Sequence, residues 1–527
     1  MAHSPDGETV FVPGAAPGDE ADVRIVKDCK RYAFGILDEV LTPSPDRIPV
    51  DCAVAGPCGG CSLRHLDYAA ELRAKQENVA DAFARIGGLD VPVLPIVGSP
   101  EVNRYRNKVQ FPVGVDKSGK PCIGFYAGRT HRIVPCPDCR LQPGVLNEIG
   151  NALCAFFAEK GIQPYSEETG RGLVRHIFLR RGAHSGQIMV CLVCTRARLP
   201  SAEELCTRLK AQFAEITTIL LNVNAKNTNV ILGTETHTLY GPGYIEDTLC
   251  GVPVQLGPLS FYQVNTLAAE QLYGIAAQYA QLTPDDLLLD LYCGMGTIGL
   301  SMVDRCRSLT GVEIVPEAID SAKANAARMG EAVAARSRFF CADAGKAASQ
   351  LAAEGLHPDV IVLDPPRKGC DEATLSAVVA MSPPRVVYVS CNPSTAARDA
   401  KWLETQGYRT EKVQPVDLFP RTKHVECVIA FSKGEIDSKK VRVEFSLEGI
   451  DTSGLQKGAT YPEIKARVLE QTGLKVSSLY ISQVKQKCGL EVRENHHKAK
   501  SENTKQPQCP PEKEAAIRDA LKYFKMI

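Results

Sequence analysis

Five short apolar runs recur at roughly twenty-residue intervals in the second half of the chain, with helical patterns between them. They are Leu287–Tyr292, Leu309–Val315, Arg338–Ala342, Val360–Leu363 and Val386–Val389. Apolar strands separated by helices indicate βαβ units, which build a parallel sheet with helices on both faces. Two further runs, Lys412–Val416 and Val425–Phe431, lie too close together for a helix and predict an antiparallel pair at the end of the sheet. The pattern therefore predicts a Rossmann-like, doubly wound domain.

The rest of the chain divides into parts of different character. Residues 1–46 hold short alternating strands between Gly and Pro turns, which predict a small β-barrel of the OB type that is too short to be complete. Residues 47–257 mix strand and helix patterns and predict an α+β central domain. We assign residues 258–433 to the doubly wound domain and residues 434–527 to an extra α+β extension. The chain is thus expected to be a multidomain α/β protein.

The extension has no distinctive motif. Lys439–Leu447 and Val476–Gln483 predict strands, and Tyr461–Thr472 and Pro511–Phe524 predict helices. Its spacing of potential zinc ligands fits no standard site; these residues are Cys488, His496, His497 and Cys509. A mild excess of Lys and Arg favours a domain that docks on RNA or on another protein.

Charge and hydropathy restrict the class of partner. Lys and Arg number 61, as do Asp and Glu, so the net charge is zero and any nucleic-acid surface must be a local patch. No apolar run reaches the length of a membrane span, and Met1–Gly7 lacks the features of a secretory signal. We therefore expect a cytoplasmic protein that does not bind membranes.

The first apolar run leads into a glycine loop. The run carries Asp290, and the loop Gly294-x-Gly296-x-x-Gly299 opens the next helix, where a ligand can lie against the backbone. Glu313 ends the following strand, at the place where a carboxylate accepts ribose hydroxyls. Both NAD and S-adenosylmethionine folds have an acidic residue there, so this loop alone leaves the cofactor open.

Three later motifs fall at strand ends. Asp364-Pro-Pro-Arg-Lys-Gly follows the fourth run, where two prolines stiffen the loop, and Ser-Cys391-Asn-Pro follows the fifth. The carboxyl ends of parallel strands share one crevice, so the loops meet there. Cys391 is a candidate nucleophile, and Glu426 in His-Val-Glu is a candidate general base at the start of the last strand.

A cysteine nucleophile beside S-adenosylmethionine points to a particular reaction. Methylation of an amine needs no covalent help, because nitrogen has a lone pair. Carbon-5 of a pyrimidine becomes nucleophilic only after a group adds at carbon-6, and a thiolate does this well. A base must then remove the C5 proton so that the thiolate can leave.

Four motifs together resemble the RNA uracil-C5 methyltransferase family across about residues 257–433. They are Asp-Leu-Tyr-Cys-Gly-Met-Gly-Thr, Leu-Asp-Pro-Pro-Arg-Lys-Gly, Val-Ser-Cys-Asn-Pro and His-Val-Glu. The resemblance implies that Cys391 attacks uracil C6 and that Glu426 takes the C5 proton. It also implies a set of cofactor residues: Gln263, Tyr292, Glu313, Asp343 and Asp364. Thr297 stands where some relatives carry Asn, which puts a side-chain contact at that position in doubt.

A cysteine cluster in the central domain has the spacing of a metal site. Cys52-x5-Cys58-Gly-Gly-Cys61 supplies three thiols, and Cys136 and Cys139 are candidates for the fourth. Zinc and a 4Fe–4S cluster both accept four thiolates. The ribosomal branch of the family carries this spacing with a distant Cys-Pro, so the resemblance implies a 4Fe–4S cluster on Cys52, Cys58, Cys61 and Cys136, with Cys139 as the alternative fourth ligand.

Two basic stretches of the central domain are candidates for RNA contacts. Asn103–Lys108 mixes basic and aromatic residues, and the second stretch runs from Arg171 to Arg181. The N-terminal module resembles a TRAM domain through Val10–Gly14 and Tyr32–Gly35.

The sequence as a whole predicts a monomeric enzyme that methylates C5 of a uridine in RNA, with 23S ribosomal RNA as the expected substrate. A tRNA uridine methyltransferase is the nearest alternative. An amino-methyltransferase acting on a base also uses Asp-Pro-Pro, and it would not need Cys391. A non-catalytic RNA-binding or ribosome-assembly factor is the alternative outside enzymes.

Overall fold

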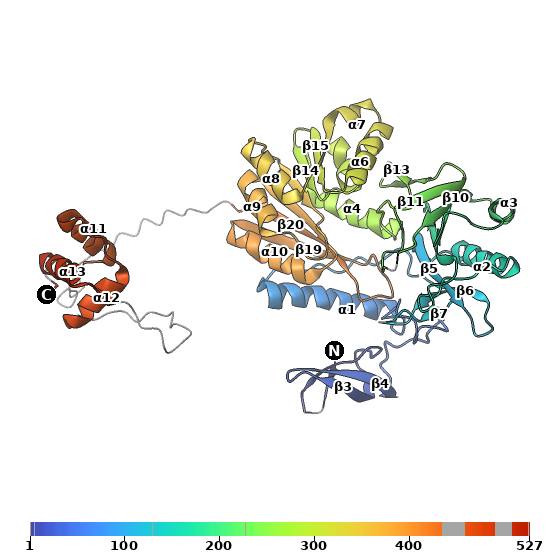
Figure 1. Ribbon diagram of the computed structural model, residues 1–527, viewed down its shortest axis with the longest axis horizontal. Helices are drawn as coiled ribbons and strands as arrows, with labels where there is room; N and C mark the ends of the chain where they lie inside the picture. The colour runs from blue at the N-terminus through green and yellow to red at the C-terminus, as the bar shows by residue number, and fades with distance from the viewer. Residues whose placement is uncertain are drawn as a thin grey trace. The chain divides into compact units, whose positions relative to one another are not determined.

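The computed structural model describes residues 2–4, 6–128, 130–226, 228–434, 459–490, 508–524 and 526–527. It divides into two compact units, Met1–Asp437 and Ser438–Ile527 (Figure 1), and each is described by itself. Within the described residues, no helix is long and apolar enough to cross a membrane.

The chain begins with a small β module. Its strands are β1 (Ala2–His3), β2 (Thr9–Phe11), β3 (Glu20–Asp28) and β4 (Ala33–Thr42), in the order β1-β2-β4-β3. A Cβ atom on Gly35 would come 2.2 Å from a methyl carbon of Val23, so the close approach of β3 and β4 requires glycine there. The predicted N-terminal β module is confirmed.

The central part is a seven-stranded sheet covered on one face by two helices. The sheet order is β11-β10-β9-β8-β5-β6-β7. The strands are β5 (Lys108–Val115), β6 (Pro121–Tyr126), β7 (Ile133–Pro135), β8 (Val174–Arg181), β9 (Ile188–Cys194), β10 (Ile216–Val223) and β11 (Glu235–Tyr240). Helices α2 (Gly144–Glu159) and α3 (Ala202–Gln212) pack on one face. The other face contributes Phe178, Met189 and Leu220 to a core shared with the hairpin β12 (Ile245–Leu249) and β13 (Val252–Leu256) and with α4 (Thr266–Ala280).

The doubly wound sheet has the order β16-β15-β14-β17-β18-β20-β19. Its strands are β14 (Leu287–Leu291), β15 (Ser308–Glu313), β16 (Ser337–Cys341), β17 (Val360–Leu363), β18 (Arg385–Ser390), β19 (Tyr408–Val416) and β20 (Glu426–Lys433). Strands β14 to β18 are parallel, and β20 is antiparallel to both β18 and β19. Both the parallel sheet and its antiparallel end pair are therefore confirmed.

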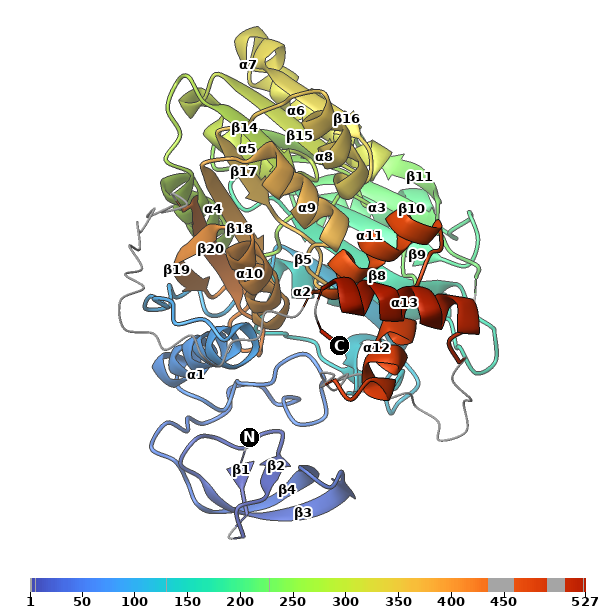
Figure 2. The same ribbon diagram turned by 90° about the vertical axis from the view of Figure 1, so that its left-hand side faces the viewer.

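Helices cover both faces of this sheet (Figure 2). One face carries α4, α5 (Thr297–Met302) and α6 (Pro316–Arg328), and a short helix, α7 (Glu331–Arg336), follows them in the chain. The other face carries α8 (Ala344–Ala353), α9 (Glu372–Met381) and α10 (Pro393–Thr405). Helix α1 (Tyr68–Asp81) continues into a π-helical turn at Ala82–Gly87 and packs beside α10 and β19, although it precedes them by more than 300 residues.

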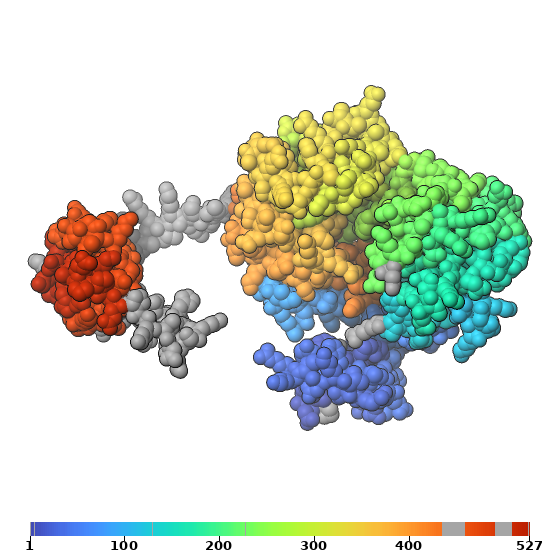
Figure 3. All heavy atoms as spheres, in the orientation of Figure 1, coloured from blue at the N-terminus to red at the C-terminus, as the bar shows by residue number. Residues whose placement is uncertain are grey.

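The central and doubly wound parts are joined by polar as well as apolar contacts, and Figure 3 shows them packed against each other in green and yellow. Asn107 Nδ2 donates to the Gln263 carbonyl at 2.7 Å, and the buried Arg180 guanidinium donates to the carbonyl of Gly257 at 2.8 Å. The structure does not test the domain boundaries placed after residues 46, 257 and 433, and these stay predictions.

The C-terminal unit contains, in its described residues, α11 (Tyr461–Thr472), α12 (Ser478–Lys487) and α13 (Pro511–Tyr523) around a core of their own. The expected helices at 461–472 and 511–524 are confirmed. The expected strand at Val476–Gln483 is wrong, because Ser477 caps a helix there by accepting the Tyr480 N–H, and Ile481 and Val484 pack into the core one helical turn apart. The other expected strand, Lys439–Leu447, lies outside the described residues, as do His496 and His497.

Candidate active site

Strand β14 delivers an acidic residue and a glycine loop to the carboxyl edge of the sheet. Asp290 is buried, and its Oδ2 accepts the Gly299 N–H at 2.9 Å, which ties the loop back to the strand. Gly294 and Gly296 have positive φ angles of 55° and 80°, and Tyr292 has the left-handed φ of 67°. The loop therefore turns sharply and opens α5 with its backbone N–H groups near the edge.

Three carboxylates come together at the ends of adjacent strands. Leu291 of β14 lies opposite Val312 of β15 and Leu363 of β17, so the next residues of those two neighbouring strands, Glu313 and Asp364, flank the glycine loop. Burial raises the pKa of Asp290 to about 8, and the negative charges of Asp364 and Glu313 add to the rise. Burial also raises the pKa of Asp364 to about 7. Two of the carboxyl groups at this edge of the sheet, Asp290 and Asp364, therefore have pKa values well above their ordinary range.

The Glu313 carboxylate is oriented by the backbone. Its Oε1 accepts the N–H groups of Ile314 and Val315 at 2.8 and 3.0 Å, and its Oε2 accepts the Gly294 N–H at 3.2 Å. Oε2 keeps a lone pair for a further donor. The strand end thus presents an aligned acceptor for a ligand hydroxyl beside the glycine loop.

The other expected cofactor residues each have a protein partner. The Gln263 side chain lies against the Tyr273 hydroxyl. The Tyr292 hydroxyl is 3.2 Å from Thr374 Oγ1 on α9, and Asp343 caps α8 by accepting the Lys346 N–H at 3.2 Å.

Thr297 is occupied within the protein. Its Oγ1 lies 3.2 Å from the Tyr273 hydroxyl in the core beneath the loop. Thr297 stands where some relatives carry Asn, and its hydroxyl is already paired with the Tyr273 hydroxyl. This pairing is a physical reason to doubt that the Thr297 side chain contacts the cofactor.

Cys391 and Glu426 leave neighbouring antiparallel strands at the same level. Ser390 of β18 pairs with Cys427 of β20, so Cys391 and Glu426 occupy the next rung. Glu426 is 6% exposed, whereas Cys391 is only partly buried and remains open to an incoming molecule. The structure thus brings the two expected catalytic side chains together at the edge that carries Asp364.

Burial and nearby carboxyl groups raise the pKa of both groups, and a neighbouring guanidinium opposes the rise. Burial raises the pKa of the Cys391 thiol, the nearby Glu426 and Asp364 carboxyls raise it further, and the Arg367 guanidinium lowers it by charge and by a hydrogen bond. Burial and Asp364 also raise the pKa of Glu426 well above its usual value, against Arg367. A carboxylate with a raised pKa is a strong proton acceptor once ionised. The arrangement can therefore exchange protons with a substrate bound over Cys391.

Helix α10 fixes the Arg367 loop, and this was missed from the sequence. Asn392 Nδ2 donates to the Arg367 carbonyl at 2.9 Å, and Arg398 donates to the Lys368 carbonyl at 3.0 Å. Asp399, buried, accepts the Cys370 N–H at 2.9 Å and the Tyr388 hydroxyl at 2.7 Å. An acidic residue within the apolar pattern of a helix was the signal that could have identified Asp399 as buried.

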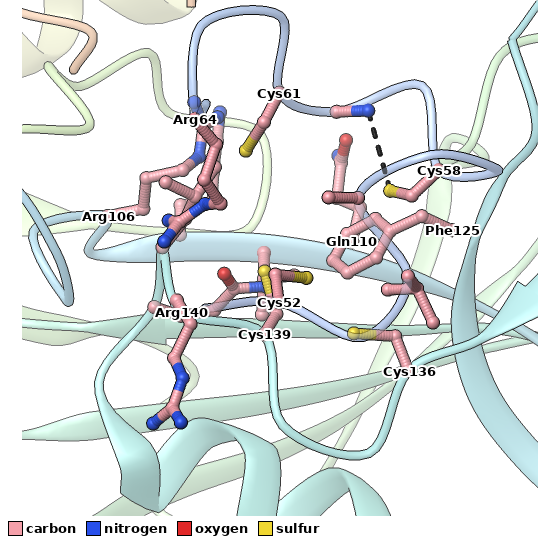
Figure 4. Close-up of a pocket in the computed structure, with 17 residues that line it drawn as sticks. Cys52, Cys58, Cys61, Arg64, Arg106, Gln110, Phe125, Cys136, Cys139 and Arg140 are labelled. Carbon is pink, nitrogen blue, oxygen red and sulfur yellow. Dashed lines mark hydrogen bonds between the residues drawn. The ribbon is translucent and has the colours of Figure 1, made fainter. Parts of the chain in front are cut away.

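Five cysteines line a single cavity of about 310 Å³ in the central part (Figure 4). They come from the Cys52–Cys61 loop and from the segment after β7, and they are Cys52, Cys58, Cys61, Cys136 and Cys139. All are free thiols. The same cavity is lined by four cationic side chains, Arg64, Arg106, Lys108 and Arg140, and its described lining includes no Asp or Glu. No group of three or more His, Cys, Asp or Glu in the described part of the chain stands at distances that would hold a metal ion.

The thiols of this cavity differ in acidity. A hydrogen bond from Cys136 lowers the pKa of Cys139 to about 7, and the same pairing raises the pKa of Cys136. Burial raises the pKa of both Cys58 and Cys61; the Gly60 N–H, 3.4 Å from the Cys58 sulfur, counteracts this for Cys58. Cys139 is therefore the more acidic thiol of this pair, in a cavity lined by cationic side chains.

Several residues expected to contact RNA serve the fold instead. Arg104 donates to the carbonyls of Cys139 and Gln142, and Arg175 donates to that of Asn224 at 3.0 Å. Arg180 is 1% exposed. The expectation that Arg175 and Arg180 contact phosphate is therefore wrong, because both are buried, whereas for Arg104, whose side chain is 32% exposed, it stays a prediction. Lys108 lies in the cysteine cavity, where burial lowers its pKa to about 8.

Comparison with known proteins agrees with this geometry. Residues 185–434 match the family model tRNA (Uracil-5-)-methyltransferase, and residues 1–37 match the TRAM domain. An RNA methyltransferase of Halalkalibacterium halodurans is 44% identical over 80% of this chain and 92% of its own length, and one of Bacillus cereus is 42% identical over 81% and 93%. The crystal structure of Pyrococcus abyssi tRNA (uracil-54, C5)-methyltransferase in complex with S-adenosyl-L-homocysteine matches with a TM-score of 0.64 and 26% identity, covering 81% of this chain and 98% of that one.

The sheet order, the glycine loop and the acidic strand ends define an S-adenosylmethionine-dependent methyltransferase. The relatives are named RNA methyltransferases, which restricts the class to methyltransferases that act on RNA. The chain belongs to the RNA uracil-C5 methyltransferase family.

Proposed function

We propose that this enzyme methylates C5 of a uridine in 23S ribosomal RNA through a covalent bond between Cys391 and C6 of the base. The observation that carries the mechanism is that Cys391 and Glu426 occupy the same rung of the sheet. Cys391 is partly exposed and so open to the uracil ring, whereas the carboxyl group of Glu426 is buried. Gln263, Tyr292, Glu313, Asp343 and Asp364 are proposed to hold the cofactor around the glycine loop. The expected cytoplasmic location and monomeric state stay predictions.

The residues act in sequence. Cys391 loses its proton to solvent and forms a bond to C6, and the C5–C6 π electrons move toward C5 and the ring carbonyl. When bound, S-adenosylmethionine would supply an electrophilic methyl group, which C5 takes as the S–CH3 bond breaks and S-adenosylhomocysteine is left. Glu426 then takes the C5 proton, the C5–C6 double bond re-forms, and the bond from C6 to sulfur breaks to return the thiolate. A paired or stacked uridine cannot reach Cys391, so the base must be flipped or already unpaired.

Two kinds of RNA remain as substrate. The cysteine spacing resembles the ribosomal branch and supports 23S RNA. The family model and the Pyrococcus abyssi enzyme are both named for tRNA, which makes tRNA the second candidate.

The cysteine cavity fits a 4Fe–4S cluster in its donors and charge. We propose Cys52, Cys58, Cys61 and Cys136 as ligands, because a cluster with four thiolates is anionic and four cations line the cavity. The Gly60 N–H near Cys58 is the type of donor that stabilises a metal-bound sulfur. In the described part of the chain the thiols do not stand at distances that would hold a metal ion, so we expect cluster binding to rearrange them. The bound cluster would pin this loop and needs no role in electron transfer.

The test uses methyl-labelled S-adenosylmethionine and total RNA from a strain that lacks the gene. Wild-type protein and Cys391→Ala are incubated with the RNA, the RNA classes are separated, and the nucleosides are resolved. We expect label in 5-methyluridine of 23S RNA and none with Cys391→Ala. Label in tRNA instead would show that tRNA is the substrate and would leave the proposed chemistry unchanged. Label on an amino group, or label that survives Cys391→Ala, would overturn the covalent mechanism, and no label in any RNA would favour a non-catalytic RNA-binding factor.

A further inference from the structure

A buried ionic network joins α1 to the loop that leads into β20. Lys75 Nζ lies 2.7 Å from Glu71 Oε1 and 2.8 Å from Asp417 Oδ1, and it donates to the Phe419 carbonyl at 3.2 Å. The side chains of Lys75, Glu71 and Asp417 are 2%, 0% and 0% exposed. The loop runs between the paired residues Val416 and Glu426, so the segment fixed by Lys75 ends at the proposed base.

A second cation completes the network. The Arg421 N–H donates to Glu71 Oε1 at 2.7 Å, and the Arg421 guanidinium lies 3.6 Å from the same carboxylate and donates to the Leu66 carbonyl at 2.8 Å. Two carboxylates and two cations therefore balance one another inside the protein. Arg421 itself has a positive φ of 69°. A residue other than glycine adopts this backbone conformation only where its surroundings impose it.

Neutral groups hold the same loop from two further sides. The Tyr68 hydroxyl donates to Asp417 at 3.0 Å, and the Tyr105 hydroxyl donates to the Pro420 carbonyl at 3.0 Å. The Ser62 and Leu63 N–H groups, next to Cys61, both donate to the Arg421 carbonyl at 3.0 and 3.1 Å. The cysteine loop, α1 and the loop before Glu426 thus form one continuous hydrogen-bonded assembly.

Buried ion pairs of this kind fix geometry rather than add stability. Removing water from the charges costs about as much as their attraction returns, so well-packed apolar residues would stabilise the fold equally well. Losing one partner, in contrast, leaves a buried charge unbalanced. The network is therefore suited to hold one conformation of the Asp417–Val425 loop.

We propose that Lys75 is a positioning residue for Glu426, a role that rests on the proposed function. Without Lys75, the loop loses the ammonium group that ties Asp417 and the Phe419 carbonyl to Glu71 of α1, and the loop moves, carrying Glu426 away from the C5 proton. The bond from Cys391 to C6 and the methyl transfer depend on β18 and on the glycine loop, which Lys75 does not touch. Removal of the proton, and with it release of the RNA, is the step expected to fail.

The test follows the covalent protein–RNA complex under single-turnover conditions with methyl-labelled S-adenosylmethionine. Denaturing gels separate labelled RNA that is attached to the protein from released RNA. For Lys75→Met we expect release slowed on the order of 100-fold, as for a displaced catalytic group, with labelled complex accumulating. Lys75→Arg is expected to restore much of the release. Glu426→Gln is the positive reference. Arg73→Met is the matched control, because Arg73 is on the same helix, its side chain is 58% exposed, and it forms an ion pair with Asp46.

The outcomes separate this proposal from the proposed function. If the wild type makes no 5-methyluridine, or Glu426→Gln accumulates no complex, the function or its base is wrong. If those two behave as expected and Lys75→Met lowers formation and release of the complex equally, Lys75 supports only the fold. Should Lys75→Met fail to fold, the double variant Glu71→Gln/Lys75→Met removes one charge of each sign. Wild-type release by that folded double variant would overturn the proposal, and an accumulated complex would support it.

Discussion

Ser390 and Cys427 form the last paired rung between β18 and β20, and the residues that follow this rung are Cys391 and Glu426. Antiparallel pairing sets two side chains from distant parts of the sequence at one level. The sheet therefore brings the proposed nucleophile and base to the same level, and the loop between Val416 and Glu426 leads directly into the base. Arg367 and Asp364 reach the same place from β17 and set the acidity of both groups.

Arg367 is expected to control the pH range of the reaction. Its guanidinium lowers the pKa of both Cys391 and Glu426, so Arg367→Gln should raise both. Each group must lose a proton to act, and the acid limb of the rate profile should therefore move to higher pH in the variant. Single-turnover rates measured across pH test this. Lys368→Gln, the exposed neighbour, is the control, and equal profiles for Arg367→Gln and wild type would contradict the assignment.

Asp290 is expected to make the ligand-free fold less stable as pH rises. Its folded pKa of about 8 exceeds the ordinary value of 3.8, so between these values the folded state binds more protons than the unfolded state. The stabilisation is complete below the lower value and is lost as pH rises through the upper one. The free energy of unfolding of Asp290→Asn should therefore fall less over this interval than that of wild type. Denaturant titrations at several pH values measure the difference, and parallel curves would argue against a protonated Asp290.

The doubly wound sheet was predictable because buried parallel strands leave continuous apolar runs, and their ends carry the site residues. Residues whose role depends on distant partners were not predictable. Lys75 looks like a solvent-facing lysine of a helix, and its ion pair with Asp417 spans 342 residues of sequence. In the sequence Arg180 resembles a phosphate ligand, but in the structure it is buried and donates to the Gly257 carbonyl.

The local sequence pattern also led to a wrong prediction in the C-terminal unit, where a strand was expected and a helix is found. Val476–Gln483 contains Val, Tyr and Ile, which favours a strand. The cap at Ser477 and the packing of Ile481 against α11 and α13 stabilise a helix instead, and among the residues that the structure describes in this unit there is no strand for it to pair with.

Asp399 is expected to position the Arg367 loop. Asp399→Ala leaves the buried Tyr388 hydroxyl and the Cys370 N–H without their acceptor, which costs about 1–3 kcal/mol for a buried polar group. We expect lower stability in denaturant and a fall in the rate of methyl transfer. Asp399→Asn keeps an acceptor oxygen and should lose less of both. A stable Asp399→Ala with the wild-type rate would show that α10 does not hold this loop.

Cys136 and Cys139 are expected to differ in their effect on iron. If Cys136 is the fourth ligand, Cys136→Ser should lose most of the iron and sulfide measured per chain, and Cys139→Ser should retain them. Cys154→Ser is the control, because Cys154 is a buried thiol in the core of α2. The reverse pattern would make Cys139 the ligand, consistent with the lowering of its pKa to about 7. Zinc in place of iron would replace the cluster by a thiolate zinc site.

The C-terminal unit is expected to fold independently of the enzyme. Its helices enclose their own core, with Ile464, Ile481 and Ile517 fully buried, and Ser438–Ile527 separates as a compact unit. A chain ending at Asp437 should therefore lose one calorimetric transition and keep the other at the same temperature. Ile517→Asp in the full chain is the matched control, because it disrupts the small core alone and should remove the same transition. If the remaining transition moves in either variant, the unit contributes to the stability of the enzyme. If the shortened chain binds RNA more weakly at an unchanged single-turnover rate, the unit docks the substrate rather than taking part in the reaction.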